Sequence, residues 1–158
     1  MAGRKIQKDI LEIVIAFAAA WLFYQGLAFA TGTSMPLVSV VSASMEPVLH
    51  RGDLIFVVNP SDIQVGDIGI YRRNCELRDI MLNLCASQGS YVDIIHRVHE
   101  ERQDGFIFKG DNNPCVDTIS GSCSGDPLIV KKEQIQGKVV LAVPLLGYPR
   151  LILYTFGI

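Results

Sequence analysis

Three separated segments of this chain carry the residue types needed for nucleophilic catalysis. Ser44 lies in "SASMEP", just before a proline-terminated bend; His96 lies in "IIHRV"; Asp117 ends the segment "KGDNNPCVD". A serine hydroxyl is a weak nucleophile until a neighbouring base takes its proton, and a carboxylate can orient an imidazole for that task. We therefore predict a nucleophile, a base and an orienting acid. On these residues alone, unconnected turn residues are an equal alternative.

The base is chosen among three histidines. His50 adjoins an arginine in a predicted turn, and we expect it at the surface. His96 and His99 share one predicted strand, where an odd separation points their side chains to opposite faces. They should therefore not bind one metal ion together, and at most one of them faces a site.

A predicted hairpin favours His96. The pair Asp104-Gly105 is a strong two-residue turn signal. If Gln103 pairs with Phe106, His96 falls opposite Asn113, at the start of a loop that carries two carboxylates, Asp111 and Asp117. A carboxylate partner would fix the tautomer of the imidazole and stabilise its protonated form. A slip of one residue in register would favour His99 instead.

The elements that must position these residues are predicted to be short strands separated by turn signals such as Arg51-Gly52-Asp53 and Asn59-Pro60. A short helix or irregular turn is indicated only at residues 130–136. The expected strands are Leu37–Val41, Leu54–Val58, Ile68–Arg72, Tyr91–His99, Phe106–Lys109 and Lys138–Val143. The fold class is therefore a mostly β, all-β domain.

An uncharged apolar segment, residues 13–30, precedes this domain. As a helix it would span roughly 27 Å, enough for the hydrocarbon core of a bilayer. Arg4, Lys5 and Lys8 precede it, so the positive-inside rule leaves the N-terminus in the cytoplasm and exports the domain. A cleaved leader ending at the "AFA" of residues 28–30 is the competing interpretation. We favour a retained anchor over residues 1–33 and an extracytoplasmic domain over residues 34–158.

Composition excludes some functions. The chain has 158 residues, 49% of them hydrophobic, and a net charge of −2 without a basic cluster, which argues against nucleic acid as a partner. The tail of residues 139–158 is apolar with one charge, Arg150, and prolines at 144 and 149 make it a poor spanning helix. It is either core packing or an apolar rim that rests on the lipid bilayer.

Four cysteines bracket two polar loops, Cys75 with Cys85 and Cys115 with Cys123. An exported domain permits disulfides, and these short-range pairs would close both loops. Four cysteines allow three pairings, and the sequence does not choose among them. Zinc binding is less favoured because no two cysteines have the C-x-x-C spacing.

The blocks "SASMEPVLHRGD", "IIHRV" and "KGDNNPCVD", in that order, resemble the signature blocks of signal peptidase I of the archaeal and endoplasmic-reticulum type. The resemblance covers most of the chain. It implies that Ser44 is the nucleophile, His96 the general base, Asp117 the orienting acid and Asp111 an essential supporting carboxylate. It also implies an all-β peptidase fold and acyl-enzyme chemistry without a metal or cofactor. The family commonly has Gly where Ala43 stands and two acids at the end of the last block, so the duties of Asp111 and Asp117 could be exchanged.

The resemblance therefore predicts a membrane-bound serine endopeptidase that removes signal peptides from exported precursors. It would lie in the cell membrane, or in the endoplasmic-reticulum membrane of a eukaryote. The N–H of Ser44 would bind the oxyanion with the Ser42 hydroxyl as a second donor, although that hydroxyl could equally stabilise the turn. Two rivals are a related membrane serine peptidase with other precursors and a non-catalytic anchored β domain. Whether accessory subunits take part is left open.

Overall fold

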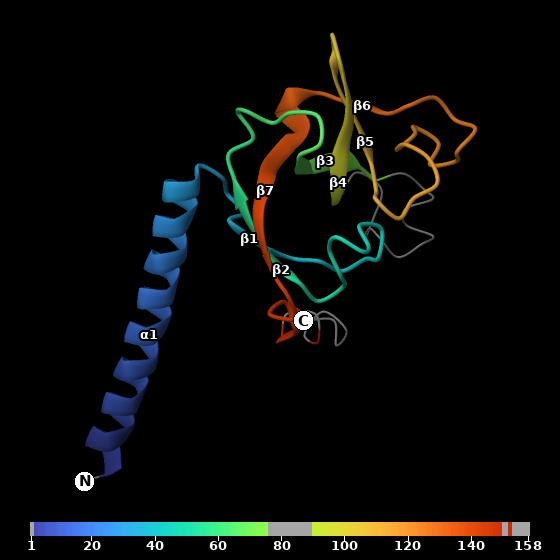
Figure 1. The fold of residues 1–158 in the computed structure, drawn as a ribbon. Coiled ribbons are helices and arrows are strands. Elements are labelled where there is room, and N and C mark those ends of the chain that lie inside the picture. Colours follow the sequence, from blue (N-terminus) through green and yellow to red (C-terminus); the bar gives the residue numbers. More distant parts are fainter. Residues whose placement is uncertain (1, 76–89, 150–151, 153–158) are drawn as a thin grey trace.

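The chain forms one long helix followed by an antiparallel β domain (Figure 1). The structure is a computed structural model, and it describes residues 2–75, 90–149 and 152. Helix α1 (Ala2–Thr31) stands away from the sheet, and its segment Lys5–Thr31 is long and apolar enough to cross a membrane. None of that segment is buried against the domain. The helix therefore fits a single membrane span.

The end of α1 is tied to the sheet by hydrogen bonds on both sides of a short polar link. The N–H of Asn59 donates to the carbonyl of Thr31 at 2.8 Å, and its side-chain amide donates to the carbonyl of Gly32 at 3.2 Å. The Thr33 hydroxyl donates to the carbonyl of Gln136 at 2.9 Å. These contacts fix the position of the β domain relative to the C-terminal end of α1.

Within the described residues, seven antiparallel strands form one sheet in the order β1-β2-β7-β3-β4-β5-β6. Their bounds are β1 (Leu37–Ser39), β2 (Leu54–Val58), β3 (Ile68–Asn74), β4 (Tyr91–Arg102), β5 (Gly105–Lys109), β6 (Ile129–Val130) and β7 (Ile135–Val143). The prediction of a mostly β domain behind one apolar helix is confirmed. The one-turn 3-10 helix η1 (Lys132–Gln134) lies within residues 130–136, where a short helix or irregular turn was predicted, whereas the strand β6 was not predicted.

Apolar side chains pack into two clusters. In β3, Ile70 belongs to one cluster and its neighbour Tyr71 to the other, as the alternation of side chains along a strand requires. The first cluster comprises Ile63, Tyr71, Val98, Phe106, Phe108, Val130 and Ile135. The second comprises Val40, Met45, Leu49, Ile55, Val57 and Ile70. Strands β3, β4 and β5 are therefore held rigidly from within the domain.

The turn of the β4–β5 hairpin is not the predicted one. Arg102 pairs with Gly105, whereas the prediction paired Gln103 with Phe106. Gly105 is the first residue of β5, with a φ of 152°, and the carbonyl of Val130 packs so closely that a Cβ would overlap it. The glycine is needed for this close approach of β6, not for the centre of the turn.

The register beyond the turn was consequently also wrong. A bulge in β4 shifts the pairing further, so that Arg97 pairs with Lys109. Extended by one residue, this register sets His96 across from Gly110, where the prediction set it opposite Asn113. A bulge leaves no turn signal in the sequence, which is why the prediction missed it.

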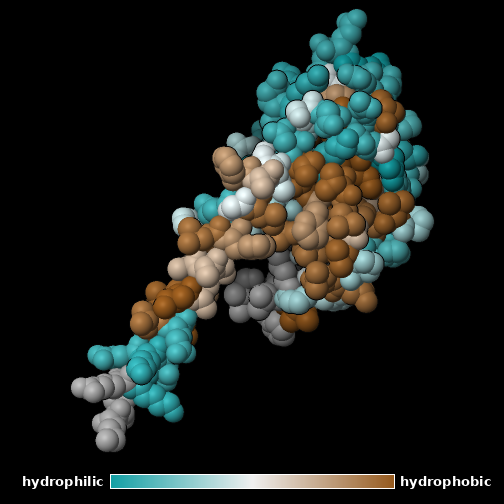
Figure 2. All heavy atoms as spheres, turned by 60° about the vertical axis from the view of Figure 1, so that its left-hand side comes forward, coloured by the Kyte–Doolittle hydropathy of each residue, from teal (hydrophilic) through white to brown (hydrophobic). Residues whose placement is uncertain are grey.

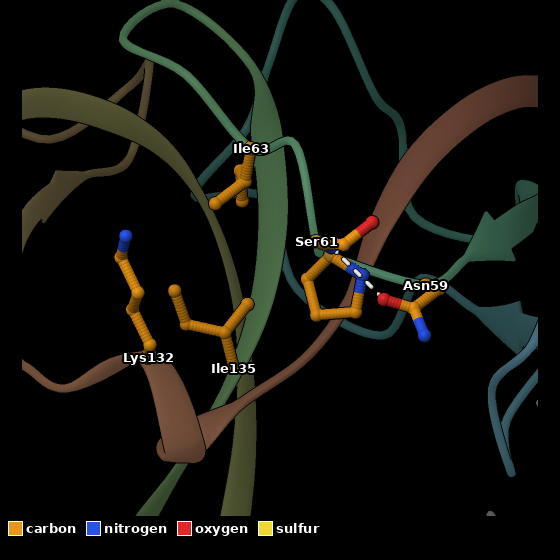
Figure 3. A pocket seen from close by; sticks show the side chains of 6 residues that line it. Asn59, Ser61, Ile63, Lys132 and Ile135 are labelled. Atoms are coloured by element: carbon orange, nitrogen blue, oxygen red, sulfur yellow. Dashed lines mark hydrogen bonds between the residues drawn. The ribbon is translucent and has the colours of Figure 1, made fainter.

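A cavity of about 140 Å³ lies beyond the end of β2, beside η1 (Figure 3). Within it, the N–H of Ser61 donates to the side-chain oxygen of Asn59 at 2.9 Å, which closes the turn after β2. The cavity is lined by Asn59, Pro60, Ser61, Ile63, Lys132 and Ile135. None of these residues belongs to the predicted catalytic set.

Apolar side chains also lie exposed on one face of the domain and along α1 (Figure 2). Leu145 is 64% exposed and Leu141 is 56% exposed. These two leucines lie at and just after the C-terminal end of β7. Other apolar side chains of the domain that are more than half exposed include Val41, Val48, Val140 and Leu146. Such a surface is unusual on a domain surrounded by water, and it marks a place of contact with lipid or protein.

Candidate active site

The buried side chain of His96 pairs with that of Asp117, which is largely buried. Nδ1 of His96 lies 2.6 Å from Oδ2 of Asp117, and the two side chains are only 9% and 13% exposed. His96 projects from β4 on the same face as Val98, which belongs to the first apolar cluster. A carboxylate at Nδ1 holds the proton on that nitrogen and leaves the lone pair of Nε2 available as a base. The structure thus brings together two of the predicted site residues.

The backbone of Asp117 runs between two neighbouring segments of the domain. Its N–H donates to the carbonyl of Phe108 at 2.8 Å, and its carbonyl accepts from the N–H of Leu128 at 2.8 Å. A disulfide joins Cys115 to Cys123 and closes the loop around Asp117, which is one of the pairings that the sequence left open. Of the pair Cys75 and Cys85, Cys85 lies outside the described residues.

Ser42 is exposed and Ser44 is half-buried on the bend between β1 and β2. Their hydroxyl oxygens are 3.1 Å apart. Met45, which follows Ser44 directly, and Leu49 further along the bend are 1% and 2% exposed and belong to the second apolar cluster. The Glu46–Pro47 peptide bond between them is cis. Because Met45 and Leu49 pack in the core, they fix the conformation of the bend, and the two serine hydroxyls are held in a defined position.

Ser44 is attached to the loop that follows β5. Its carbonyl accepts from the N–H of Asn112 at 2.9 Å, and the Asn112 amide donates to the carbonyl of Ala43 at 3.1 Å. Gly110, which lies next in register across from His96, packs directly against the Ser44 carbonyl. Among the described residues, the Ser44 hydroxyl contacts that of Ser42 and makes no hydrogen bond with the imidazole.

Asp111 does not contact His96. Its two carboxylate oxygens accept from Nε and Nη2 of Arg97 at 2.9 and 2.6 Å, while Nη1 of Arg97 donates to the carbonyl of Gly66 at 2.7 Å. The hydrogen bond and the negative charge of Asp111 raise the pKa of Arg97 against the opposing effect of burial. Asp111 therefore ties its loop to β4 through an arginine, and Asp117 alone of the two carboxylates contacts the imidazole.

The sequence reasoning missed two side chains of this site. Arg97 follows His96 directly in the "HRV" block, so the block itself contained the signal. Tyr71 is 1% exposed, and its hydroxyl donates to Oδ2 of Asp117 at 2.9 Å. A tyrosine in an apolar strand needs a hydrogen-bond partner when it is buried, and that requirement was the available signal. The other two histidines, His50 and His99, are exposed.

The fold and the site together describe a class of protein: an antiparallel β domain carried by one apolar helix, with a buried histidine–carboxylate pair near an exposed serine bend. No protein-family model matches the chain. It is 32% identical over 159 residues to the signal peptidase complex catalytic subunit SEC11 of Leptosphaeria maculans, covering 97% of this chain and 83% of the relative. It is 36% identical over 151 residues to the protein of the same name from Saccharomyces cerevisiae, covering 91% and 80%.

The chain therefore belongs to the signal peptidase I family, in the type that includes SEC11. The family predicted from the three sequence blocks is confirmed, and so is the fold class.

Proposed function

We propose that this chain is a membrane signal peptidase that removes signal peptides from exported precursor proteins, with Ser44 as nucleophile, His96 as general base and Asp117 as orienting acid. Membership in a family of signal peptidase catalytic subunits supports the peptidase activity. The single observation that carries the residue assignment is the 2.6 Å contact between His96 and Asp117. A buried imidazole held by a carboxylate is the arrangement that activates a serine hydroxyl.

In the proposed reaction, Nε2 of His96 removes the Ser44 proton as the hydroxyl oxygen attacks the carbonyl carbon before the scissile bond. The imidazolium then returns the proton to the leaving amine, and an acyl-enzyme remains on Ser44. Water activated by the same imidazole hydrolyses this ester and restores the serine. Asp117 keeps its negative charge throughout and stabilises the imidazolium. Ser44 would exchange its contact with Ser42 for one with His96 when the substrate binds, since catalytic hydrogen bonds tighten in the substrate complex.

The oxyanion of the tetrahedral intermediate needs donors beside Ser44. Within the described part of the chain, the N–H of Ser44 has no hydrogen-bond partner, so it is free to donate to that oxygen. The Ser42 hydroxyl, 3.1 Å from the Ser44 hydroxyl, is near enough to serve as a second donor. Loss of one such donor typically slows a reaction by about 10²–10³-fold.

Asp111 has a supporting role in this proposal. Through its two hydrogen bonds with Arg97 it fixes the segment whose next residue, Asn112, binds the Ser44 carbonyl. Asp111 therefore acts on the position of the nucleophile, and Asp117 acts on the base. We propose this division of duties between the two carboxylates.

The helix and the exposed apolar surface support a membrane location. Residues 1–33 would form the cytoplasmic end and the anchor, and residues 34–158 the catalytic domain outside the cytoplasm, because three basic residues precede the apolar segment. The apolar surface near the end of β7 would rest on the bilayer. Confinement of enzyme and leader to one membrane raises their effective concentration. The relatives are named as subunits of a complex, so we propose that accessory subunits accompany this chain.

The test is cleavage of a leader-bearing precursor by the full chain, purified with its membrane partners, and by the variants Ser44→Ala, His96→Ala and Asp117→Asn. We expect the serine and histidine variants to be inactive and Asp117→Asn to retain a small residual rate, since such a change typically costs about 10⁴-fold. His99→Ala is the matched control and should cleave normally. Full activity of Ser44→Ala, with the fold intact by circular dichroism, would remove Ser44 from the mechanism.

A further inference from the structure

A second strand contributes a polar side chain to the histidine–carboxylate pair. Tyr71 lies in β3, with its ring 4.8 Å from that of Phe108 between ring centroids, inside the first apolar cluster. Its hydroxyl reaches out of this cluster and donates to Oδ2 of Asp117 at 2.9 Å. The same oxygen lies 2.6 Å from Nδ1 of His96. One carboxylate oxygen is thus shared by a phenol and an imidazole.

The positions of both donors are set by the sheet. In the ladder between β3 and β4, Tyr71 pairs with Ile94, and His96 follows Ile94 by two residues on the same face. Asp117 comes from a loop whose backbone is hydrogen-bonded to Phe108 and Leu128. The Tyr71 hydroxyl therefore connects the carboxylate group itself to the rigid part of the domain.

The hydroxyl also bears on the charge of the carboxylate. Within the described part of the chain, the hydrogen bonds to the Asp117 side chain come from Tyr71 and His96 alone. A buried carboxylate needs donors to remain ionised, and loss of one leaves part of its charge unsatisfied. Burial and the neighbouring charge of Asp117 raise the pKa of Tyr71 above its ordinary value. The phenol therefore stays neutral and remains a donor at every pH at which the enzyme would work.

We propose that Tyr71 is a positioning residue for catalysis: it fixes Oδ2 of Asp117 so that this oxygen holds His96 in the orientation a general base requires. The inference rests on the proposed function of His96 and Asp117. A tyrosine that served only the core would contribute its ring, and its hydroxyl could be removed without effect on the reaction. The positioning role therefore requires the hydroxyl oxygen of Tyr71, whereas a role in the core requires only its ring.

The variant Tyr71→Phe removes that oxygen and keeps the ring. We expect kcat for precursor cleavage by the full chain to fall about tenfold or more, because hydrogen bonds to charged groups are among the stronger ones. KM should stay within about twofold, since the phenol is buried beneath the site and contacts no substrate. Tyr91→Phe, at an exposed tyrosine of β4, is the matched control and should leave both constants unchanged.

A double-mutant cycle separates positioning from a structural role. If Tyr71 acts through Asp117, adding Tyr71→Phe to Asp117→Asn should change the residual kcat much less than Tyr71→Phe changes that of the wild type. A merely structural hydroxyl would give the same fold-loss in both backgrounds, and this result would overturn the proposal. So would a wild-type kcat for the single Tyr71→Phe variant.

The proposed function and this inference can fail separately. If His96→Ala and Asp117→Asn cleave the precursor normally, the proposed mechanism itself is wrong. If those variants are impaired while Tyr71→Phe is not, only the role of Tyr71 is wrong. Thermal melting of each variant shows whether a lost rate reflects loss of the fold.

Discussion

Gly110 is the point at which Ser44, the proposed nucleophile, can be displaced without changing any of the proposed catalytic side chains. A Cβ on this residue would lie 2.7 Å from the backbone oxygen of Ser44 and 2.6 Å from the side-chain nitrogen of Asn113. The amide of Asn113 belongs to a side chain that can rotate away. The Ser44 oxygen belongs to the backbone and already accepts a hydrogen bond from Asn112. Gly110→Ala must therefore move the serine bend or the loop.

The size of the movement follows from these contacts. The hypothetical Cβ is about 0.7 Å closer to the Ser44 oxygen than the 3.4 Å at which ordinary contact begins. A displacement of about 1 Å in a catalytic group can cost about 10²-fold in rate. We expect Gly110→Ala to lower kcat by roughly tenfold to a hundredfold. The effect on KM should be smaller, since the added methyl group acts on the position of the nucleophile.

The assay is single-turnover cleavage of a precursor, with thermal melting to monitor the fold. Gly26→Ala, in α1 with nothing within 4 Å of its added Cβ, is the matched glycine control and should cleave at the wild-type rate. Adding Asn113→Ala to Gly110→Ala relieves the side-chain overlap and leaves the backbone overlap, so the double variant should remain slow. A folded Gly110→Ala protein with wild-type kcat would refute the reasoning that Ser44 is placed by this contact.

Two further predictions concern the ion pairs Arg97–Asp111 and Lys138–Asp67. Arg97→Lys keeps the charge but cannot make both hydrogen bonds to Asp111, so kcat should fall about tenfold while Ser44→Ala remains the more severe variant in the same cleavage assay. Burial raises the pKa of Asp67, but the hydrogen bonds that it accepts from Lys138 and a backbone N–H together outweigh burial and lower this pKa below 3.8. The ionised Asp67 therefore stabilises the fold above pH 3.8, and this stabilisation is lost as the pH falls through the lowered pKa. The melting temperature of Asp67→Asn should therefore lie below that of the wild type at pH 7, and the difference should vanish in acid; an equal difference at both pH values would contradict this.

Much of the sheet could be predicted from local sequence because its signals are local. Strand β2 has the predicted bounds, Leu54–Val58, since an apolar run lies between two turn signals there. The longer strands were found but placed short at their ends, as for β4, which continues to Arg102. The short strand β6 was missed. Two residues carry too little pattern to predict, and this strand exists because it pairs with β5.

The contact between His96 and Asp117 was predicted by an argument whose register was wrong. The prediction placed the loop after β5 beside His96 by extending a hairpin ladder, whereas the ladder ends sooner and the chain turns back. Asp117 reaches the imidazole because its N–H binds the carbonyl of Phe108, so that the loop returns alongside β5. The pairing of residue types was thus correct, but the path of the chain that produces it depends on a long-range hydrogen bond.

The contact of Tyr71 with Asp117 could not be predicted from the three sequence blocks, because it depends on which strands become neighbours. Tyr71 precedes the blocks of His96 and Asp117, and it meets them only because β3 pairs with β4 in one particular register. The same register places Gly69 across from His96. A Cβ on Gly69 would overlap Ile63 and press on the ring of Phe108, which packs against Tyr71. The blocks therefore contain the residues of the proposed mechanism, and the packing of β3 fixes the position of Tyr71, which we propose holds the Asp117 carboxylate in place.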